Sequence, residues 1–161
     1  MKRYFALILS AAILGAGCST DQRLTNTTTS PQSKIVTEGT ELDLSGRGLT
    51  SIPSDVFSRK DLVKLNLSNN RLTGAPQSQI GQLENLKSLD LSGNSLTGLP
   101  AELGRLYKLE TLNVAHNKLT GLPMELGNLT QLLVLDVSGN PYSSQDLDAI
   151  ASKLSKTEIR R

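Results

Sequence analysis

The chain has 161 residues, of which 37% are hydrophobic and only 3% are aromatic. This length leaves room for one modest domain with extensions, and it excludes a large multi-domain enzyme. The 17 basic residues are almost balanced by 15 acidic ones, so the composition gives no reason to expect a nucleic-acid partner, whose phosphates require clustered Lys and Arg.

Residues 1–17 combine the basic start MKR with an apolar run over residues 4–17. The run is shorter than the roughly 20 residues that a membrane-spanning helix needs, which is typical of a secretory signal peptide. It ends in the letters LGAG directly before the only cysteine, Cys18. This stretch resembles the lipobox of bacterial lipoprotein precursors, in which a small residue precedes a cysteine that becomes lipidated.

The resemblance implies that Cys18 becomes the first residue of the mature protein and carries acyl chains, such as palmitate. Two or more chains give stable membrane anchoring. Ser19 differs from the Asp that tends to retain lipoproteins in the inner membrane. We therefore expect a lipid-anchored protein of the cell envelope, in the outer membrane where the organism has one. The alternative is a free or buried Cys18 on an uncleaved segment.

Residues 18–38 are expected to form a flexible tether. The stretch 19–34 contains one leucine and no apolar period. Such a segment cannot bury enough apolar surface to offset the entropy lost on ordering. The tether would hold the following domain away from the membrane.

A repeat of 23 or 24 residues runs through residues 39–142. The motif L-x-x-L-x-L-x-x-N-x-L is complete at 62–72 and 86–96. Its central pair of apolar residues recurs at offsets of 23, 24, 23 and 23 residues, as Leu42/Leu44, Leu65/Leu67, Leu89/Leu91, Leu112/Val114 and Leu135/Val137. These residues closely resemble the leucine-rich repeat family, and they predict five coils starting near residues 39, 62, 86, 109 and 132.

The repeat predicts an α/β fold, a leucine-rich repeat solenoid. Alternate side chains of a strand point to opposite faces, so the apolar pair points inward and the residues around it point outward. One coil cannot bury its leucines alone, so the coils stack and their strands form a short parallel β-sheet on the concave face. Short helices or 3-10 turns are expected on the convex face.

Three residue columns have expected structural roles. An asparagine ladder should bond backbone groups that each turn leaves unpaired; it comprises Asn70, Asn94, Asn117 and Asn140. Prolines suit the first position of each short convex helix; they are Pro53, Pro76, Pro100 and Pro123. Glycines are expected to end these helices, at Gly81, Gly104 and Gly127.

Residues 143–161 are predicted to be a C-terminal capping helix and tail. Ser143 or Ser144 can begin the helix. Its apolar residues recur at helical spacing, at Leu147, Ile150, Ala151 and Leu154. The extra residue of the second repeat lies within 77–79, and we expect it to bulge on the convex side without disturbing the sheet.

The outward positions of the strands give a small, polar concave surface without aromatic residues. Its central column is Asp43, Asn66, Asp90, Asn113 and Asp136. Residues of the middle three coils should lie near the centre of the concave face, where contacts are most easily desolvated. They are the candidate binding residues: Lys64, Asn66, Asn69, Asp90, Asn113 and His116. The alternative is that they are ordinary fillers of a solvated repeat surface.

A catalytic site at His116 and a metal site on the acidic column are the alternatives to a binding surface. His116, the only histidine, lies on coils adjacent to Ser92 and Ser138, but a hydrolase site needs a sheltered pocket that an open sheet does not offer. Calcium needs six to eight converging oxygens, whereas neighbouring strands lie about 4.8 Å apart. We therefore expect no enzyme activity, no metal and no cofactor, with a hydrolase centred on His116 as a remote alternative.

The sequence thus predicts a membrane-anchored leucine-rich repeat lipoprotein. It would be a monomer that binds another protein at the bacterial cell envelope, with the membrane reached through Cys18. A surface adhesin resembling internalin-type repeats is the alternative. Fold alone does not identify the ligand.

Overall fold

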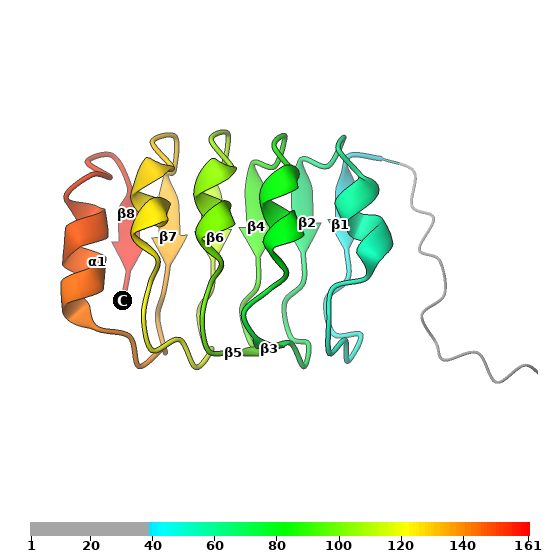
Figure 1. The fold of residues 1–161 in the computed structure, drawn as a ribbon, viewed down its shortest axis with the longest axis horizontal. Helices are drawn as coiled ribbons and strands as arrows, with labels where there is room; N and C mark the ends of the chain where they lie inside the picture. The colour runs from blue at the N-terminus through cyan, green and yellow to red at the C-terminus, as the bar shows by residue number, and fades with distance from the viewer. Residues whose placement is uncertain (1–38) are drawn as a thin grey trace, which may run out of the picture. The chain divides into compact units, whose positions relative to one another are not determined.

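A computed structural model describes residues 39–161, which form a stack of coils (Figure 1). The signal peptide over 1–17, Cys18 and the tether over 18–38 lie outside the described residues. Within the described part of the chain, no helix has the length and apolar character that crossing a membrane requires.

The main sheet is parallel, and each coil contributes one short strand to it. In chain order its strands are β1 (Glu41–Asp43), β2 (Lys64–Asn66), β4 (Ser88–Asp90), β6 (Thr111–Asn113), β7 (Val134–Asp136) and β8 (Glu158–Arg160). The register follows the leucine column, because Leu42 pairs with Leu65 and Leu65 pairs with Leu89. The solenoid with a parallel sheet that the repeat predicts is therefore confirmed.

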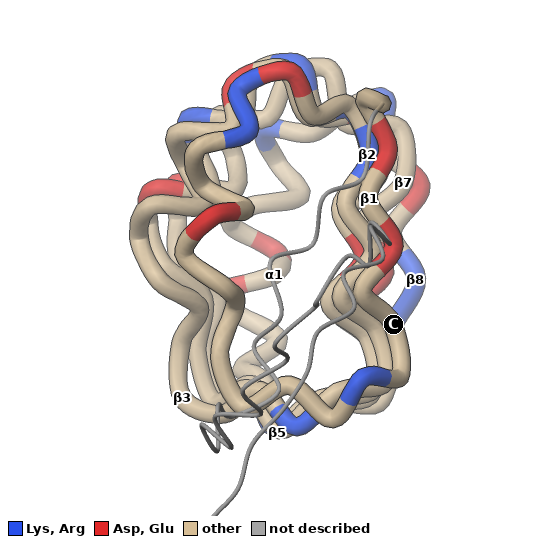
Figure 2. The backbone as a smooth tube through the Cα atoms, turned by 90° about the vertical axis from the view of Figure 1, so that its right-hand side faces the viewer, with Lys and Arg blue, Asp and Glu red and all other residues tan. Residues whose placement is uncertain are grey.

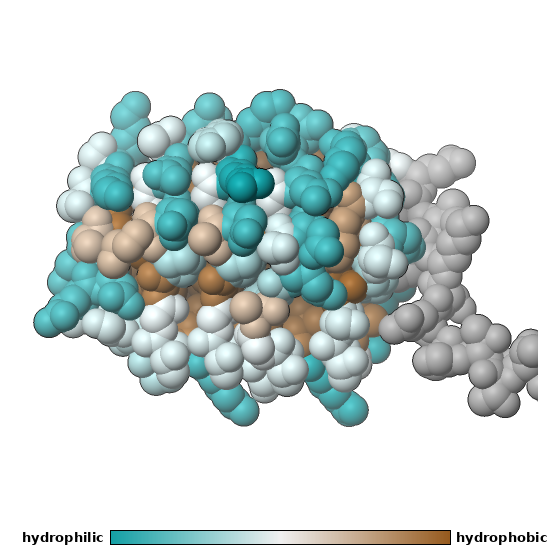
Figure 3. Space-filling view, in the orientation of Figure 1, coloured by the Kyte–Doolittle hydropathy of each residue, from teal (hydrophilic) through white to brown (hydrophobic). Residues whose placement is uncertain are grey.

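Short helices cover the opposite side of the stack. They are the 3-10 helices η1 (Ser54–Ser58), η2 (Ser78–Gln82), η3 (Ala101–Arg105) and η4 (Met124–Asn128), and the α-helix α1 (Ser144–Ala151). This convex face is mostly hydrophilic, with hydrophobic side chains visible between the helices and the loops below them (Figure 3). A small second sheet pairs β3 (Thr73–Gly74) with β5 (Ser95–Leu96) in the loops that follow the main strands.

The prolines lie one position earlier than expected. Pro53, Pro100 and Pro123 are the residues immediately before η1, η3 and η4, with φ between −57° and −72°. Gln77 has this place before η2, so it is the extra residue of the second repeat. Its side chain donates a hydrogen bond to the backbone oxygen of Ile52 at 3.1 Å, and the register of the main sheet continues without a break.

The expectation that glycines end the convex helices is wrong. Gly81 and Gly104 lie inside η2 and η3, and they are buried. A Cβ atom on Gly104 would lie 2.5 Å from the backbone oxygen of Glu125 in the next helix, and the corresponding contact of Gly81 is with the backbone of Glu102. These glycines therefore allow consecutive convex helices to stack closely.

The hydrophobic core is one continuous column between the sheet and the convex helices. Leu65, Leu89 and Leu112 point into it from the sheet and are at most 1% exposed. Leu103 and Leu126 meet them from the helices and are fully buried. Since each coil supplies only a few apolar side chains, stacking the coils is what removes them from water.

The C-terminal segment begins as expected and ends differently. Helix α1 packs against η4 and buries Leu147 and Ile150. Ser143 directly precedes the helix, but its side chain makes no capping hydrogen bond. The predicted tail instead contains β8, which pairs with β7 and adds a sixth strand to the sheet. The helix thus takes the convex position of the fifth coil, and β8 starts a further one.

Candidate functional site

The asparagine ladder lies at the ends of the strands. Asn94 is 8% exposed, and its Nδ2 donates to the backbone oxygens of Leu91, in its own coil, and Leu67, in the preceding coil, at 2.9 and 3.1 Å. Its Oδ1 accepts the backbone N–H of Leu72 at 3.1 Å. The equivalent amides make the same kinds of bond and are Asn70, Asn117 and Asn140. This column joins neighbouring coils and is unavailable to a ligand.

The central concave column also makes local contacts. The Oδ1 atom of Asp90 accepts hydrogen bonds from the backbone N–H and the hydroxyl of Ser92, at 2.9 and 2.6 Å. Asn66 and Asn113 accept the backbone N–H two residues further on in the same way. Each of these side chains therefore supports its own turn with one oxygen. Its remaining polar atom lies on the concave face, where Asp90 and Asn113 bond to each other.

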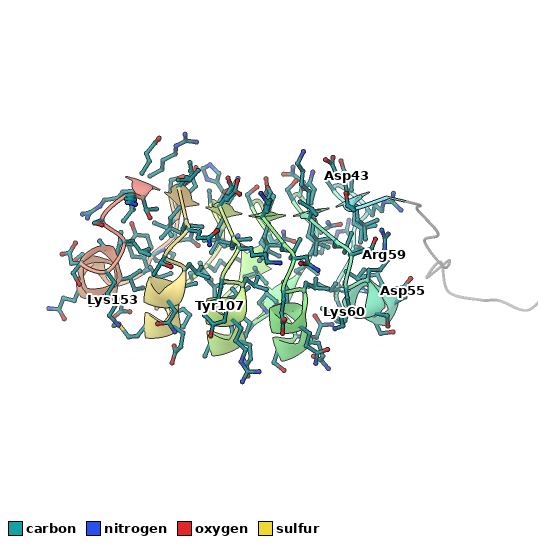
Figure 4. All side chains as sticks on the ribbon, turned by 90° about the horizontal axis from the view of Figure 1, so that it is seen from above. Asp43, Asp55, Arg59, Lys60, Tyr107 and Lys153 are labelled. Carbon is teal, nitrogen blue, oxygen red and sulfur yellow. The ribbon has the colours of Figure 1, made fainter. Side chains whose placement is uncertain are left out.

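Asp43 continues this column at the first strand. Seen from above, it projects from the sheet on the side opposite to η1, which carries Asp55 (Figure 4). Hydrogen bonds from the side chain and the backbone N–H of Ser45 lower the pKa of Asp43, and the charge of Arg47 adds to this effect. The carboxylate is therefore held in its ionised form at neutral pH.

A shallow hollow of about 380 Å³ lies over the first three strands of the concave face. It is lined by Glu41, Leu42, Asp43, Lys64, Leu65, Asn66, Ser88 and Asp90. Lys64 forms an ion pair with Glu41 across β1 and β2, with 2.7 Å between Nζ and Oε1. Both side chains are more than half exposed, so this pair contributes little to stability and remains open to a partner's charges.

Three of the six candidate binding residues thus line one hollow, namely Lys64, Asn66 and Asp90. Asn113 lies beside it, because its Nδ2 donates to Oδ2 of Asp90 at 3.2 Å. Asn69 and His116 lie outside it, in the loops that follow β2 and β6.

Asn69 and His116 adopt an uncommon backbone conformation. Their φ angles are 55° and 54°, in the left-handed region that favours glycine. The equivalent residues of other coils are glycines with φ near 64°, among them Gly93 and Gly139. These two side chains lie against the glycine of the following coil, so packing accounts for their position.

The serine and histidine side chains do not form a hydrolytic arrangement. The hydroxyl of Ser138 donates to Oδ1 of Asp136 at 2.7 Å, as the hydroxyl of Ser92 does to Asp90. His116 meets Ser138 through the backbone, where its N–H donates to the Ser138 oxygen at 2.8 Å. Among residues 39–161, no side-chain hydrogen bond joins the imidazole to a serine hydroxyl, and no three His, Cys, Asp or Glu side chains are grouped closely enough to hold a metal ion.

Three polar lining residues, Glu41, Asp43 and Ser88, were not among the binding candidates. Their signal was the repeat register, which places Glu41, Lys64 and Ser88 in one row across β1, β2 and β4. Arg160 of β8 extends the central column beside Asp136. No repeat motif marks this strand, so sequence reasoning did not find it.

The family model described as leucine rich repeat matches residues 40–96, 60–119 and 84–141. These matches cover most of the repeat region and agree with the parallel sheet and the buried leucine column. The chain therefore belongs to the leucine-rich repeat proteins, whose fold is typically a non-catalytic module for protein interaction. No curated protein matches the chain.

Solved structures add bacterial and plant relatives of this fold. A leucine-rich repeat protein of Leptospira interrogans is 40% identical, with a TM-score of 0.66 over 70% of this chain and 28% of its own. The ectodomain of the Arabidopsis thaliana receptor kinase GASSHO1/SCHENGEN3, solved with CASPARIAN STRIP INTEGRITY FACTOR 2, is 35% identical, with a TM-score of 0.65 over 74% and 15%. The chain thus spans less than a third of either relative.

An internalin of Listeria monocytogenes is also similar. It is 22% identical, with a TM-score of 0.58 over 68% of this chain and 37% of its own. At this level of identity the likeness shows the fold alone.

Proposed function

We propose that this protein is a lipid-anchored leucine-rich repeat module that binds another protein at the bacterial cell envelope. The observation that carries the interaction part is the open concave hollow, whose charged and polar side chains include the exposed pair of Glu41 and Lys64. The anchoring part is supported by the apolar run before Cys18.

Similar structures support a protein ligand. The GASSHO1/SCHENGEN3 ectodomain was solved in a complex with CASPARIAN STRIP INTEGRITY FACTOR 2. A structure that is 36% identical over 64% of this chain is that of the BIR3–SERK2 complex of Arabidopsis thaliana. A small concave sheet buries less than the roughly 800 Å² per partner of a standard interface, so binding to this module should be weak without help from co-localisation at the membrane.

Lipidation is tested by replacing Cys18 with serine. Mass spectrometry of the wild-type protein from bacterial membranes should show a mature chain that begins at an acylated Cys18. The Cys18→Ser precursor should remain uncleaved. An unmodified Cys18 in the mature chain would refute the lipoprotein proposal and leave the interaction proposal to be tested separately.

The docking site is tested after a partner has been captured by crosslinking in intact envelopes. The triple variant Glu41→Ala, Lys64→Ala, Ser88→Ala removes one row of the hollow without touching a residue that caps a turn. We expect at least a tenfold loss of affinity with an unchanged melting temperature. A second variant, Asn113→Ala with His116→Ala, tests two candidate residues that lie outside the hollow.

The matched control is on the convex face. Glu102, Glu125 and Asn128 line a hollow of about 320 Å³ between η3 and η4, and their replacement by alanine should leave binding unchanged. Loss of binding in this control, with full binding in the row variant, would move the site to the convex side.

The adhesin alternative makes a different prediction about orientation. Protease added to intact cells should cleave an outward-facing adhesin, whereas a periplasmic module should be protected until the envelope is opened. The internalin likeness does not decide between these locations, because it shows the fold alone.

A further inference from the structure

The charges of the solenoid are separated between its sides. The loops that follow the main strands form its lower rim in Figure 1 and comprise residues 46–51, 69–75, 93–98, 116–121 and 139–142. They contain three Lys or Arg residues and no Asp or Glu: Arg47, Arg71 and Lys118. We call these three residues the basic rim. In Figure 2 the lower rim shows the blue of Lys and Arg and none of the red of Asp and Glu.

The basic rim is exposed and largely uncompensated. All three side chains are on the surface. No ion pair among the described residues involves Arg71 or Lys118. Arg47 donates to the backbone oxygen of Asp43 at 3.1 Å and lies near its carboxylate. The charges of Arg71 and Lys118 are therefore fully available to an anion.

The other sides of the solenoid do not share this character. The convex helices contain a single Lys or Arg, Arg105, and five acidic residues, which are Asp55, Glu102, Glu125, Asp146 and Asp148. The opposite rim has more basic residues than the lower rim, but it also contains Asp61, Glu84 and Glu110. Two of its cations are paired, Arg59 with Asp61 at 3.3 Å and Lys87 with Glu110 at 2.8 Å. An extended anionic surface would therefore attract the lower rim and repel the convex face.

The spacing of the basic rim indicates the form of the anion. Arg47, Arg71 and Lys118 belong to the first, second and fourth coils, and neighbouring coils are about 4.8 Å apart. The cations therefore follow the length of the solenoid and do not converge on one point. Between them the exposed loop residues are mainly Gly, Ser and Thr, and the larger side chains of the rim, Asn69, His116 and Tyr142, carry no carboxylate. A row of this kind fits a surface of many anionic groups better than one compact anion.

We propose that the basic rim docks the domain onto the anionic phospholipid surface of the membrane that holds its N-terminus. The proposal rests on the membrane attachment proposed above. Docking by this rim leaves the concave hollow and the convex face both accessible to a protein partner. Each basic residue near an anionic membrane strengthens association about fivefold, so three together favour docking by on the order of a hundredfold.

The test uses the full chain reconstituted into vesicles that carry a lipid-borne fluorescence quencher. A dye is attached through Thr97→Cys on the lower rim, or through Thr130→Cys on the opposite rim. In vesicles with 30% anionic lipid, the Thr97→Cys dye should be quenched more strongly than in pure phosphatidylcholine, and about 1 M salt should remove the difference. The Thr130→Cys dye should show no such difference.

Charge reversal supplies the decisive comparison. Arg47→Glu, Arg71→Glu and Lys118→Glu together should abolish the dependence on anionic lipid. A control variant reverses three exposed cations elsewhere and therefore changes the net charge equally: Lys60→Glu, Arg105→Glu and Lys156→Glu. This variant should keep the dependence on anionic lipid. Equal quenching of the Thr97→Cys dye in both kinds of vesicle, or equal effects of the two triple variants, would overturn the proposal. Quenching relieved only by dissolved polyphosphate would assign the rim to a soluble polyanion.

Failure of the docking proposal can be distinguished from failure of the anchoring proposal. Mass spectrometry of the same samples reports acylation of Cys18. A Cys18→Ser chain is reconstituted in parallel, since its apolar residues 4–17 also insert into lipid. The position of the rim dye is therefore measured whether or not Cys18 is acylated.

Discussion

The imidazole of His116 lies directly over the backbone of Gly139 in the next coil. A Cβ atom on Gly139 would be 2.5 Å from Nδ1 of His116, and the φ angle of Gly139 is 66°. Asn69 has the same relation to Gly93, whose Cβ would lie 2.6 Å from its Oδ1. A large side chain at this position of one coil thus requires a glycine at the same position of the next.

This relation predicts that Gly139→Ala destabilises the domain. The left-handed conformation alone costs a non-glycine residue about 1–2 kcal/mol, and contact with His116 should add to it. Urea unfolding of Gly139→Ala with and without His116→Ala separates the two effects, because the second substitution relieves only the contact. Gly98→Ala is the control, since no atom lies within 4 Å of its Cβ position. An equal effect of Gly139→Ala in both backgrounds would show that the contact is not significant.

The asparagine ladder predicts a large cost for Asn94→Ala. The substitution leaves backbone groups of two coils without partners, and each unsatisfied buried group costs about 1–3 kcal/mol. Leu91 is fully buried, and Leu91→Ala should cost about 2–5 kcal/mol. Asp90→Ala loses bonds on the outward face alone, to Ser92 and Asn113, and should cost about 1 kcal/mol. Thermal unfolding measures the three variants. A melting temperature of Asp90→Ala as low as those of Asn94→Ala and Leu91→Ala would contradict the assignment of inward and outward side chains.

The stacking of the convex helices predicts that Gly104→Ala is destabilising although its backbone is unstrained. The new Cβ would meet the backbone oxygen of Glu125, which cannot move without shifting η4. Overpacking of this kind typically costs about 1–3 kcal/mol. Denaturant unfolding measures this loss of stability, with Gly98→Ala as the control. Equal unfolding midpoints for the two variants would mean that the helices can separate at little cost.

The lowered pKa of Asp43 predicts a contribution to acid sensitivity. Because the pKa is lower in the folded than in the unfolded chain, the ionised carboxylate stabilises the fold above its ordinary pKa, and this stabilisation is lost as pH falls through the folded value. Asp43→Asn keeps the oxygen that accepts the N–H of Ser45 but cannot titrate, so its stability relative to the wild type should rise as the pH is lowered below about 4. Ser45→Ala should raise the pKa of Asp43, which NMR titration of its carboxyl group can follow. An unchanged pKa would show that Ser45 is not the cause.

The sequence by itself determined the repeat architecture. The alternation of Leu65 and Leu67 with polar neighbours assigns inward and outward faces, since successive side chains of a strand point to opposite sides. The regular offsets set the register, so the row of Glu41, Lys64 and Ser88 could have been derived from the sequence. These features depend on local periodicity, and local periodicity is visible without a structure.

The tertiary structure decided the features that depend on contacts between coils. The role of Gly104 depends on its distance to Glu125, and the role of Gly139 depends on the side chain of His116. Strand β8 has no repeat motif, and its position is defined by pairing with β7. The basic rim needed the structure as well, because Arg47, Arg71 and Lys118 are far apart in sequence and share one edge only when the coils are stacked. Distances between coils are set by packing, which no single repeat records.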